Sequence, residues 1–172
     1  MNAMKIEEYS NDHSISEIKR IDFQAVEDFY ELIKDEYSQD DLENIDVSYM
    51  SVNGDFFIAS LNDNIIGMCG FVPVDDKKAE LKRLRIEKSL RSKGYGSQLL
   101  KFVESDIKSK GFDAIEFATA SIRKPTLQFY KKHGYIEKGK SVFGELEIIN
   151  FEKILWSQSD SSSGVDKTVE II

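Results

Sequence analysis

Residues 79–100 constrain what this chain can fold into more than any other stretch. The first part mixes apolar residues with long cations and predicts a strand over residues 80–86. A basic turn with two glycines follows at residues 91–96, and the apolar residues after it are spaced as in a helix. The N–H groups of a first helical turn have no partner within the helix, and the helix dipole favours negative charge there. This strand, turn and helix therefore predict a cradle for an anion such as a phosphate group.

The length of 172 residues predicts one domain with a sizeable core, over residues 1–156. From residue 157 the composition changes to a polar, low-complexity tail, which we expect to be flexible. The chain has no apolar run close to the roughly 20 residues that cross a bilayer. The amino terminus also lacks the features of a secretory signal. We therefore expect a cytoplasmic protein without a membrane partner.

The single cysteine, Cys69, excludes an internal disulfide and any site built from several cysteines. It lies in an apolar stretch, where a cysteine is most often a small core residue. The two histidines, His13 and His133, do not form a cluster with ligand spacing, so the sequence predicts no metal site.

The net charge of −8 argues against nucleic acid as a partner. The charge is unevenly distributed, with 16 acidic and 4 basic residues in 1–63 but 17 basic and 7 acidic residues in 77–140. One interpretation is two solvated faces. The other is that the basic part holds an anionic cofactor and the acidic part attracts a cationic substrate.

Periodicity predicts both helices and strands in the rest of the chain. Residues 15–37 read as one helix or as two with a break near Asp22, and residues 38–54 as a loop with a short helix. Further helices are expected at residues 94–110 and 125–133, and strands at residues 5–9, 56–61, 65–74, 80–86, 114–120, 135–138 and 145–154. The strand at 114–120 follows a strand and a helix, so it should run parallel to the strand at 80–86.

Two motifs resemble those of a known family. Arg91, Gly94 and Gly96 fill the fixed positions of the cofactor motif of the Gcn5-related N-acetyltransferase (GNAT) family, which reads Arg or Gln, two residues, Gly, one residue, Gly or Ala. The run LQFYKKHGY at residues 127–135 resembles the family's second signature, a helix with Phe or Leu before Tyr, and Gly with an aromatic residue four positions later. The motifs stand in the family's order and separation, and the resemblance covers residues 56–154.

The resemblance implies an α/β (α+β) fold with a mixed sheet of six or seven strands, splayed in the middle and flanked by helices. It implies acetyl-CoA as co-substrate in the gap of the sheet, with its diphosphate on the backbone N–H groups of the basic turn. The cofactor-binding residues implied there are Arg91, Ser92, Lys93, Gly94, Tyr95, Gly96 and Ser97.

The resemblance also implies that the backbone of Leu84, Arg85 and Ile86 binds the pantetheine arm like an added strand. Three positions depart from the family pattern. Lys88 stands where Pro is frequent, in the loop before the basic turn. Ser92 stands where Gly is common, an exchange that ordinary backbone angles would tolerate. Arg123 stands where the family often has an Asn that contacts the pantetheine arm, so this arginine either pairs with a cofactor phosphate or is exposed.

The resemblance implies two catalytic residues, Tyr130 and Glu80. The phenol of Tyr130 has an ordinary pKa of about 10, which suits a general acid that protonates a thiolate whose thiol has a pKa of about 8.5. Glu80 precedes Ile86 by six residues, as does the base glutamate in the histone-modifying branch of the family. Alternation along a strand would place Glu80, Lys82, Leu84 and Ile86 on one face. The alternative is that water molecules take the proton.

The function implied is transfer of an acetyl group from acetyl-CoA to a primary amine of a cationic acceptor, which is a small molecule or a protein or peptide amine. A second hypothesis is a non-catalytic acyl-CoA-binding or sensing module on the same fold, and a third is an anion-binding regulatory domain unrelated to CoA. Dimers are common in the family, so a homodimer that pairs the last strand remains an open alternative.

Overall fold

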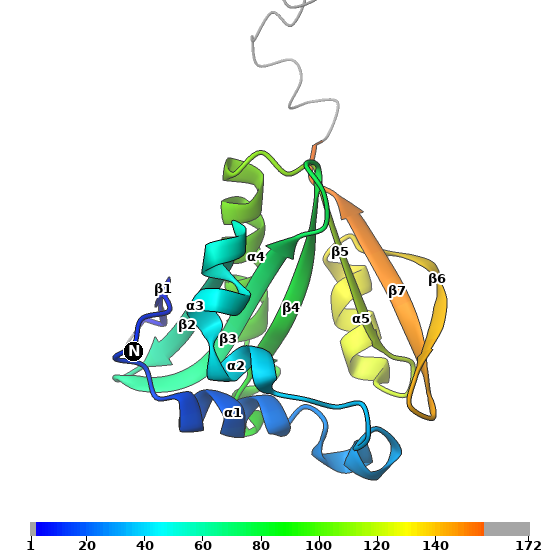
Figure 1. Cartoon of the computed structure of the whole chain (residues 1–172), viewed down its shortest axis with the longest axis horizontal. Coiled ribbons are helices and arrows are strands. Elements are labelled where there is room, and N and C mark those ends of the chain that lie inside the picture. The colour runs from blue at the N-terminus through cyan, green and yellow to red at the C-terminus, as the bar shows by residue number, and fades with distance from the viewer. Residues whose placement is uncertain (1–2, 157–172) are drawn as a thin grey trace, which may run out of the picture.

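The computed structural model describes residues 3–156, so the predicted tail at 157–172 lies outside the described residues. Its centre is a mixed seven-stranded sheet in the order β1-β2-β3-β4-β5-β7-β6, with helices on both faces (Figure 1). The strands are β1 (Lys5–Glu8), β2 (Asp55–Leu61), β3 (Asn64–Pro73), β4 (Lys78–Ile86), β5 (Ala114–Ala120), β6 (Ile136–Phe143) and β7 (Leu146–Ile154).

The α-helices are α1 (Ile15–Phe23), α2 (Asp40–Glu43), α3 (Ile45–Ser48), α4 (Tyr95–Ser109) and α5 (Lys124–Lys132). Short 3₁₀ segments form η1 (Glu27–Leu32), η2 (Met50–Val52) and η3 (Lys88–Leu90). Within residues 3–156, each helix is too short or too polar to span a membrane.

The first four strands form an antiparallel meander, β1 to β4. The predicted turn between β2 and β3 is present, and Asn62 and Asp63 both have positive φ angles, 51° and 62°. Short polar side chains tolerate this left-handed region, and two such residues match the twist of a tight hairpin. The local sequence therefore determines this connection.

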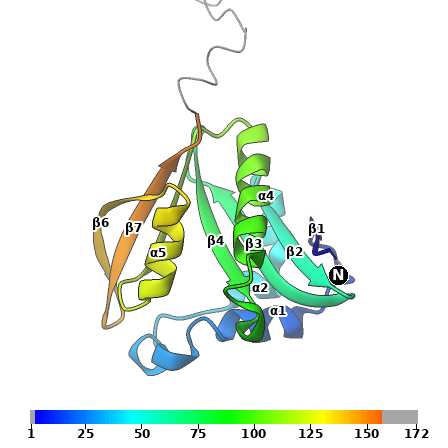
Figure 2. The ribbon, with the colours of Figure 1, turned by 180° about the vertical axis from the view of Figure 1, so that it is seen from behind.

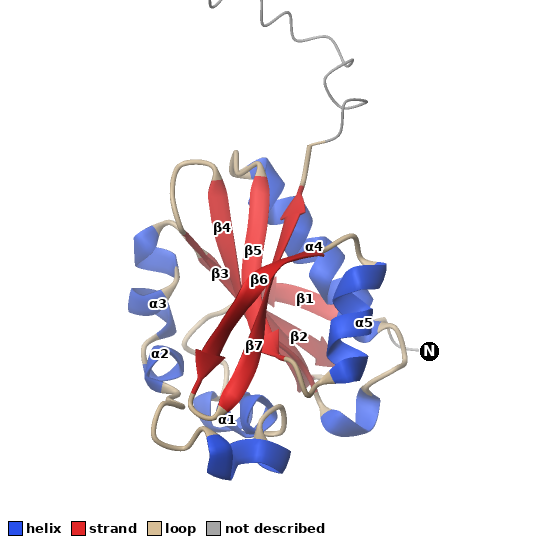
Figure 3. Ribbon diagram, turned by 90° about the vertical axis from the view of Figure 1, so that its right-hand side faces the viewer, coloured by secondary structure: helices blue, strands red, loops and turns tan. Residues whose placement is uncertain are grey.

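The sheet is covered on both faces, as Figure 3 shows from the side. The core between the sheet and the helices α4 and α5 includes Phe57, Phe71, Leu99, Val103 and Phe117. The core between the sheet and the helices α1, α2 and α3 includes Ile18, Ile21, Leu42, Phe56 and Met68. Burial on both faces explains why β2 and β3 read as continuous apolar runs rather than as alternating strands.

The predicted helix at residues 15–37 ends at Phe23, so the alternative with a break near Asp22 is confirmed. Ser14 caps α1 by accepting a hydrogen bond from the backbone N–H of Glu17. Beyond the break the chain continues as η1. Within η1, Phe29 has a φ of −133°, which lies outside the helical range. This segment then lies across the wide end of the sheet, which positions it near the site described below (Figure 1).

The strand β5 runs parallel to β4, as predicted, but the two strands pair only through Lys78–Glu80 and Ala114–Glu116. Beyond these residues β4 and β5 diverge and form a V (Figure 1). On the far side, β5 pairs with β7 and β7 with β6, both antiparallel. The predicted splayed sheet is therefore confirmed.

A β-bulge interrupts β4 at Arg83. Opposite β3, Lys82 pairs with Gly70 and Arg85 with Met68, so β4 contains one residue more than its partner over this interval. Arg83 has a φ of 56°, in the left-handed region. A bulge of this kind re-aims the side chains that follow it.

The bulge overturns one prediction, that Glu80, Lys82, Leu84 and Ile86 share a face of β4. Leu81 before the bulge and Ile86 after it both belong to the core under α4 and α5, and Leu84 packs against that core. Because the extra residue shifts the alternation, Glu80 and Lys82 face the opposite side, toward α1 to α3.

A partly buried polar cluster joins α4 to the C-terminal strands. Glu104 of α4 accepts hydrogen bonds from the hydroxyl of Tyr135 at 3.0 Å and from Nζ of Lys153 at 2.9 Å. Tyr135 is fully buried, and its ring packs against Phe117 of β5. This cluster links the two arms of the V on the side of α4 and α5.

Replacing Gly70 with Ala should lower the free energy of unfolding by about 1–3 kcal/mol. The added Cβ would lie 2.6 Å from Cδ2 of Phe56 and 2.7 Å from Cε1 of Tyr49. Both rings are fully buried and pack against each other, so neither can move away cheaply. Urea unfolding measures the change. The control is Gly139→Ala, whose Cβ would meet nothing within 4 Å, and equal losses in both variants would contradict this packing argument.

Candidate active site

The V between β4 and β5 contains a cavity of about 860 Å³. Figure 2 shows α4 over one arm of the V and α5 over the other. The wall residues come from β4, the turn before α4, the first turn of α4, β5, α5, η1 and the tip of the β6–β7 hairpin. The cavity therefore brings together the two motifs that lie far apart in the sequence.

The N-terminus of α4 lies at the position where the sequence predicts an anion cradle. Gly94 is its N-cap residue, with a φ of 89° that suits glycine, and no side chain among residues 3–156 caps this helix end. The first N–H groups of α4 therefore remain open to a ligand. Arg91 stands beside them and donates from Nε to the carbonyl oxygen of Ile86 at 3.0 Å. Burial and the nearby Arg85 guanidinium lower the pKa of Arg91, so positive charge is in excess here.

Ser92 differs from its prediction. Its φ is 63°, so the expectation of ordinary backbone angles is wrong. The chain reverses between η3 and α4 at this residue, and a left-handed conformation makes that reversal. Glycine would adopt it with less strain than serine.

All the predicted site residues line the cavity except two. Those that line it are Glu80, Leu84, Arg85, Ile86, Arg91, Ser92, Gly94, Gly96, Ser97, Arg123 and Tyr130. Lys93 is exposed outside it, and Tyr95 packs against the core under α4. Successive side chains on a helix point about 100° apart, so Tyr95 faces the sheet while Gly96 and Ser97 face the cavity.

Tyr130 lies on α5 and is 7% exposed. Its ring packs on Phe117 with a centroid distance of 3.9 Å, and its hydroxyl makes no hydrogen bond to another residue within 3–156. Burial raises the pKa of Tyr130, and the Cys69 thiol adds to this effect. The hydroxyl therefore stays protonated at neutral pH.

Glu80 lines the cavity from β4 and is half-buried. Its neighbour across the β4–β5 pairing, Glu116, forms an ion pair with Lys78 at 3.2 Å. Glu80 itself forms no ion pair with any residue that the structure describes. It is therefore a carboxylate available to a ligand in the cavity.

Arg123 stands at the N-cap position of α5 and lines the cavity. It makes no ion pair or hydrogen bond through its guanidinium group within the described part of the chain. Burial, together with Arg85 and Arg91, lowers the pKa of Arg123 to about 10. An anion in the cavity would relieve this repulsion.

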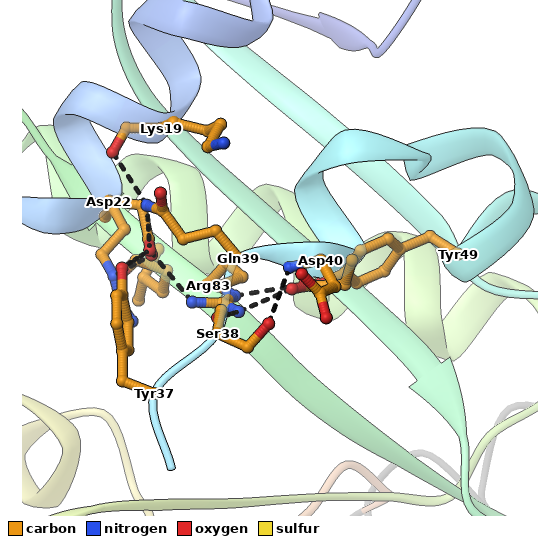
Figure 4. Close-up of polar contacts among 11 residues, drawn as sticks. Lys19, Asp22, Tyr37, Ser38, Gln39, Asp40, Tyr49 and Arg83 are labelled. Atoms are coloured by element: carbon orange, nitrogen blue, oxygen red, sulfur yellow. Dashed lines mark hydrogen bonds and ion pairs between the residues drawn. The ribbon is translucent and has the colours of Figure 1, made fainter. Parts of the chain in front are cut away.

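A buried charge network that was not predicted from the sequence is centred on Asp22 of α1 (Figure 4). Asp22 is 0% exposed. It accepts hydrogen bonds from Nη1 of Arg83 at 3.0 Å, Nε of Arg85 at 2.9 Å, the hydroxyl of Tyr37 at 2.6 Å and Nε2 of Gln39 at 3.0 Å. One carboxylate thus joins α1, the segment after η1 and the β4 bulge.

Arg83 continues this network toward α2. Its Nη2 donates to Oδ1 of Asp41 at 2.6 Å and to the carbonyl oxygen of Ser38 at 2.7 Å. The hydroxyl of Tyr49 donates to the same carboxylate. Because Arg83, Ser38 and Asp41 all line the cavity, the network fixes one of its walls.

Both carboxylates of the network have lowered pKa values. Burial alone would raise the pKa of Asp22, but Arg85 and Arg83 outweigh it. Burial alone would also raise the pKa of Asp41, but the hydrogen bonds from Arg83 and Tyr49 lower it below its ordinary value. Both groups are therefore ionised at neutral pH and neutralised by the two arginines.

Similarity to known proteins agrees with this fold. The model of the Acetyltransferase (GNAT) family matches residues 18–135. N-acetyltransferase 8 from Homo sapiens is 28% identical over 109 residues, which is 60% of this chain and 48% of the relative. The chain spans about half the length of the curated relatives it matches.

Solved structures share the fold. A GNAT family acetyltransferase from Staphylococcus aureus Mu50 superposes with a TM-score of 0.77 at 23% identity, covering 90% of this chain and 100% of that one. A GNAT family acetyltransferase from Elizabethkingia anophelis, solved with acetyl-CoA bound, has a TM-score of 0.63 at 20% identity, covering 88% and 97%. These acetyltransferases thus share the splayed sheet of this chain. The chain belongs to the acetyltransferase (GNAT) family.

Replacing Asp22 with Asn should lower the free energy of unfolding at pH 7 by about 3–5 kcal/mol, because two buried arginines lose their shared anion. The folded-state pKa of Asp22 lies below the unfolded value of about 3.9. Its contribution is therefore present above about pH 4 and is lost as the pH falls through the folded-state pKa. Urea unfolding as a function of pH measures this.

The control is Asp40→Asn, an exposed neighbour of the network, which should change the free energy of unfolding by less than about 0.5 kcal/mol. A difference between wild type and Asp22→Asn that stays constant from pH 7 to pH 3 would contradict the role of this charge.

Proposed function

We propose that the protein transfers the acetyl group of acetyl-CoA to a primary amine by direct attack. One observation carries the proposal: a single cavity is lined by an open phosphate cradle, by an unpaired carboxylate at Glu80 and by a buried tyrosine hydroxyl at Tyr130. These are the groups that acyl transfer from a thioester needs, namely a site for the anion, a base and an acid.

The cavity suits acetyl-CoA in two ways. The diphosphate would lie on the first turn of α4, with positive charge from Arg91 and Arg123. The backbone of β4 beyond Glu80 has no strand partner on the cavity side within the described residues. Its N–H and C=O groups are thus left for the amides of an extended pantetheine arm, which would bind as an added strand.

The proposed step balances with these residues. The amine nitrogen attacks the thioester carbonyl carbon, the new C–N bond forms, and the C–S bond breaks. Glu80 accepts, directly or through water, the proton that the ammonium group loses before attack, and the nitrogen passes a second proton to solvent as the amide forms. Tyr130 donates its proton to the departing thiolate and regains one from solvent.

A cationic acceptor is part of the proposal. Glu36 and Glu80 line the cavity without an ion-pair partner among the described residues, so they can attract an ammonium group. We place the protein in the cytoplasm, where reducing conditions suit the buried free thiol of Cys69. The prediction that a homodimer pairs the last strand is wrong, because β7 pairs with β5 on one side and with β6 on the other. We propose instead a homodimer through β6, which is an edge strand of the sheet.

Tyr130→Phe should lower kcat by about 10²-fold while leaving the KM for acetyl-CoA within about twofold. The hydroxyl has no protein partner within 3–156, so its loss should not unfold the protein. Release of free thiol from acetyl-CoA in the presence of amines measures the rate. Tyr135→Phe is the control, because its hydroxyl binds Glu104 and its loss should reduce stability but not kcat. Normal acetyl-CoA binding with an unchanged rate in Tyr130→Phe would instead favour the non-catalytic module.

Gly94→Ala should raise the KM for acetyl-CoA by about tenfold or more, since a side chain strains the left-handed N-cap and distorts the cradle. Gly111→Ala is a matched control at the other end of α4. Both glycines have a positive φ, 89° and 93°, and in both an added Cβ would meet nothing within 4 Å. The two variants should lose similar stability in thermal unfolding, but only Gly94→Ala should change the KM. Equal KM effects would contradict the proposed diphosphate site.

A further inference from the structure

Part of the cavity is an apolar chamber that the proposed chemistry does not use. Its wall is made by Val26, Phe29, Ile33, Ala120, Leu146 and Ile148. The first three lie in or beside η1, and the last three lie on β5 and β7. The chamber therefore forms only where the N-terminal segment meets the C-terminal half of the sheet.

The two sides of the apolar chamber touch at the tip of the β6–β7 hairpin. The backbone N–H of Glu145 donates to the carbonyl oxygen of Leu32 at 3.2 Å. Gly144 approaches so closely that an added Cβ would lie 2.5 Å from the same oxygen. In Figure 1 the segment after α1 reaches the hairpin tip below the V. This contact limits the size of an acceptor group that the chamber can hold.

The charges around the cavity do not favour an acceptor with several positive groups. The buried acids on its α1 side, Asp22 and Asp41, are already neutralised by Arg83 and Arg85 (Figure 4). Arg123 and Lys132 line the same cavity without an ion-pair partner among the described residues. A polycation would meet this positive charge, whereas a single amine next to Glu36 or Glu80 would not require further carboxylates.

Apolar surface remains exposed at the mouth of the chamber. Phe143, on the hairpin, lines the cavity and is 40% exposed, and Phe29 and Ile148 are half-buried. An apolar group of a ligand would remove this surface from water, which is favourable. The chamber is continuous with the cavity that contains Glu80 and Tyr130, so a group seated in it can hold an amine at the reacting position.

We propose that the acceptor is a small primary amine with an aliphatic or aromatic substituent, and that the substituent fills the apolar chamber. This inference rests on the proposed acetyltransferase function. It specifies the acceptor as a single cation with an apolar body, and it assigns Phe143 as a specificity-determining residue.

The test compares acetylation of 2-phenylethylamine and isopentylamine with that of ethanolamine, spermidine and a lysine-containing peptide. The apolar amines should have a kcat/KM at least about tenfold higher, the ratio expected when one apolar group is buried. Preference for spermidine or for the peptide would overturn the inference but leave the proposed function standing. Acetylation of none of the amines would overturn both.

Two hairpin variants locate the effect. Phe143→Ala should raise the KM for 2-phenylethylamine about tenfold, with the KM for ethanolamine and for acetyl-CoA within about twofold. Val142→Ala is the matched control, since Val142 is 75% exposed on the same strand and does not line the cavity. Thermal unfolding should show that both variants remain folded, because both side chains are exposed. Equal KM values in the two variants would overturn the assignment of Phe143.

Discussion

The short pairing between β4 and β5 is the constraint on which the rest of this structure depends. Three residues of each strand pair, and then the strands separate. Unpaired backbone groups inside a protein are costly, so an opening in the middle of a sheet persists only where something else satisfies them. Here the cradle of α4, the chamber beside η1 and both proposed catalytic residues lie around that opening. The break in the sheet is therefore the feature that creates the site.

The network around Asp22 gives the opening a defined wall. Arg83 adopts a left-handed backbone conformation that costs a non-glycine residue roughly 1–2 kcal/mol. Its guanidinium group is held by two carboxylates and by a backbone carbonyl, which fixes the bulge in one conformation. A buried ion-pair network of this kind contributes more to geometry than to net stability. We infer that its role is to keep α1, the segment after η1 and β4 in register around the cavity.

The sequence was sufficient for the features that depend on local chemistry. The turn with Gly94 and Gly96, the parallel β5 and the helix that carries Tyr130 each follow from glycine spacing, periodicity or chain order. The bulge at Arg83 was missed, although the apolar residues of this strand, Ala79, Leu81, Leu84 and Ile86, step by two, three and two. The consecutive cations Lys82 and Arg83 interrupt the alternation where the bulge lies.

The contacts between residues far apart in the chain could not be predicted from the sequence. Asp22 lies within an amphipathic helical pattern, and its arginine partners are more than 60 residues away. The apolar chamber combines η1 with a hairpin over 100 residues later, and β6 gave only a weak strand signal because all its side chains are exposed. Such contacts depend on tertiary packing, which periodicity does not encode.

The paired residues of β4 and β5, which form a seam at the closed end of the V, also affect the angle between the two halves of the sheet. Ala79 sits in that seam, fully buried and opposite Ile115. From Ala79 to Ile86 the strand extends about 20 Å, so a rotation of only 5° at the seam would move the far end by about 2 Å. We therefore expect a change of side-chain volume at position 79 to alter the width of the V at its open end, although Ala79 lies outside the cavity wall.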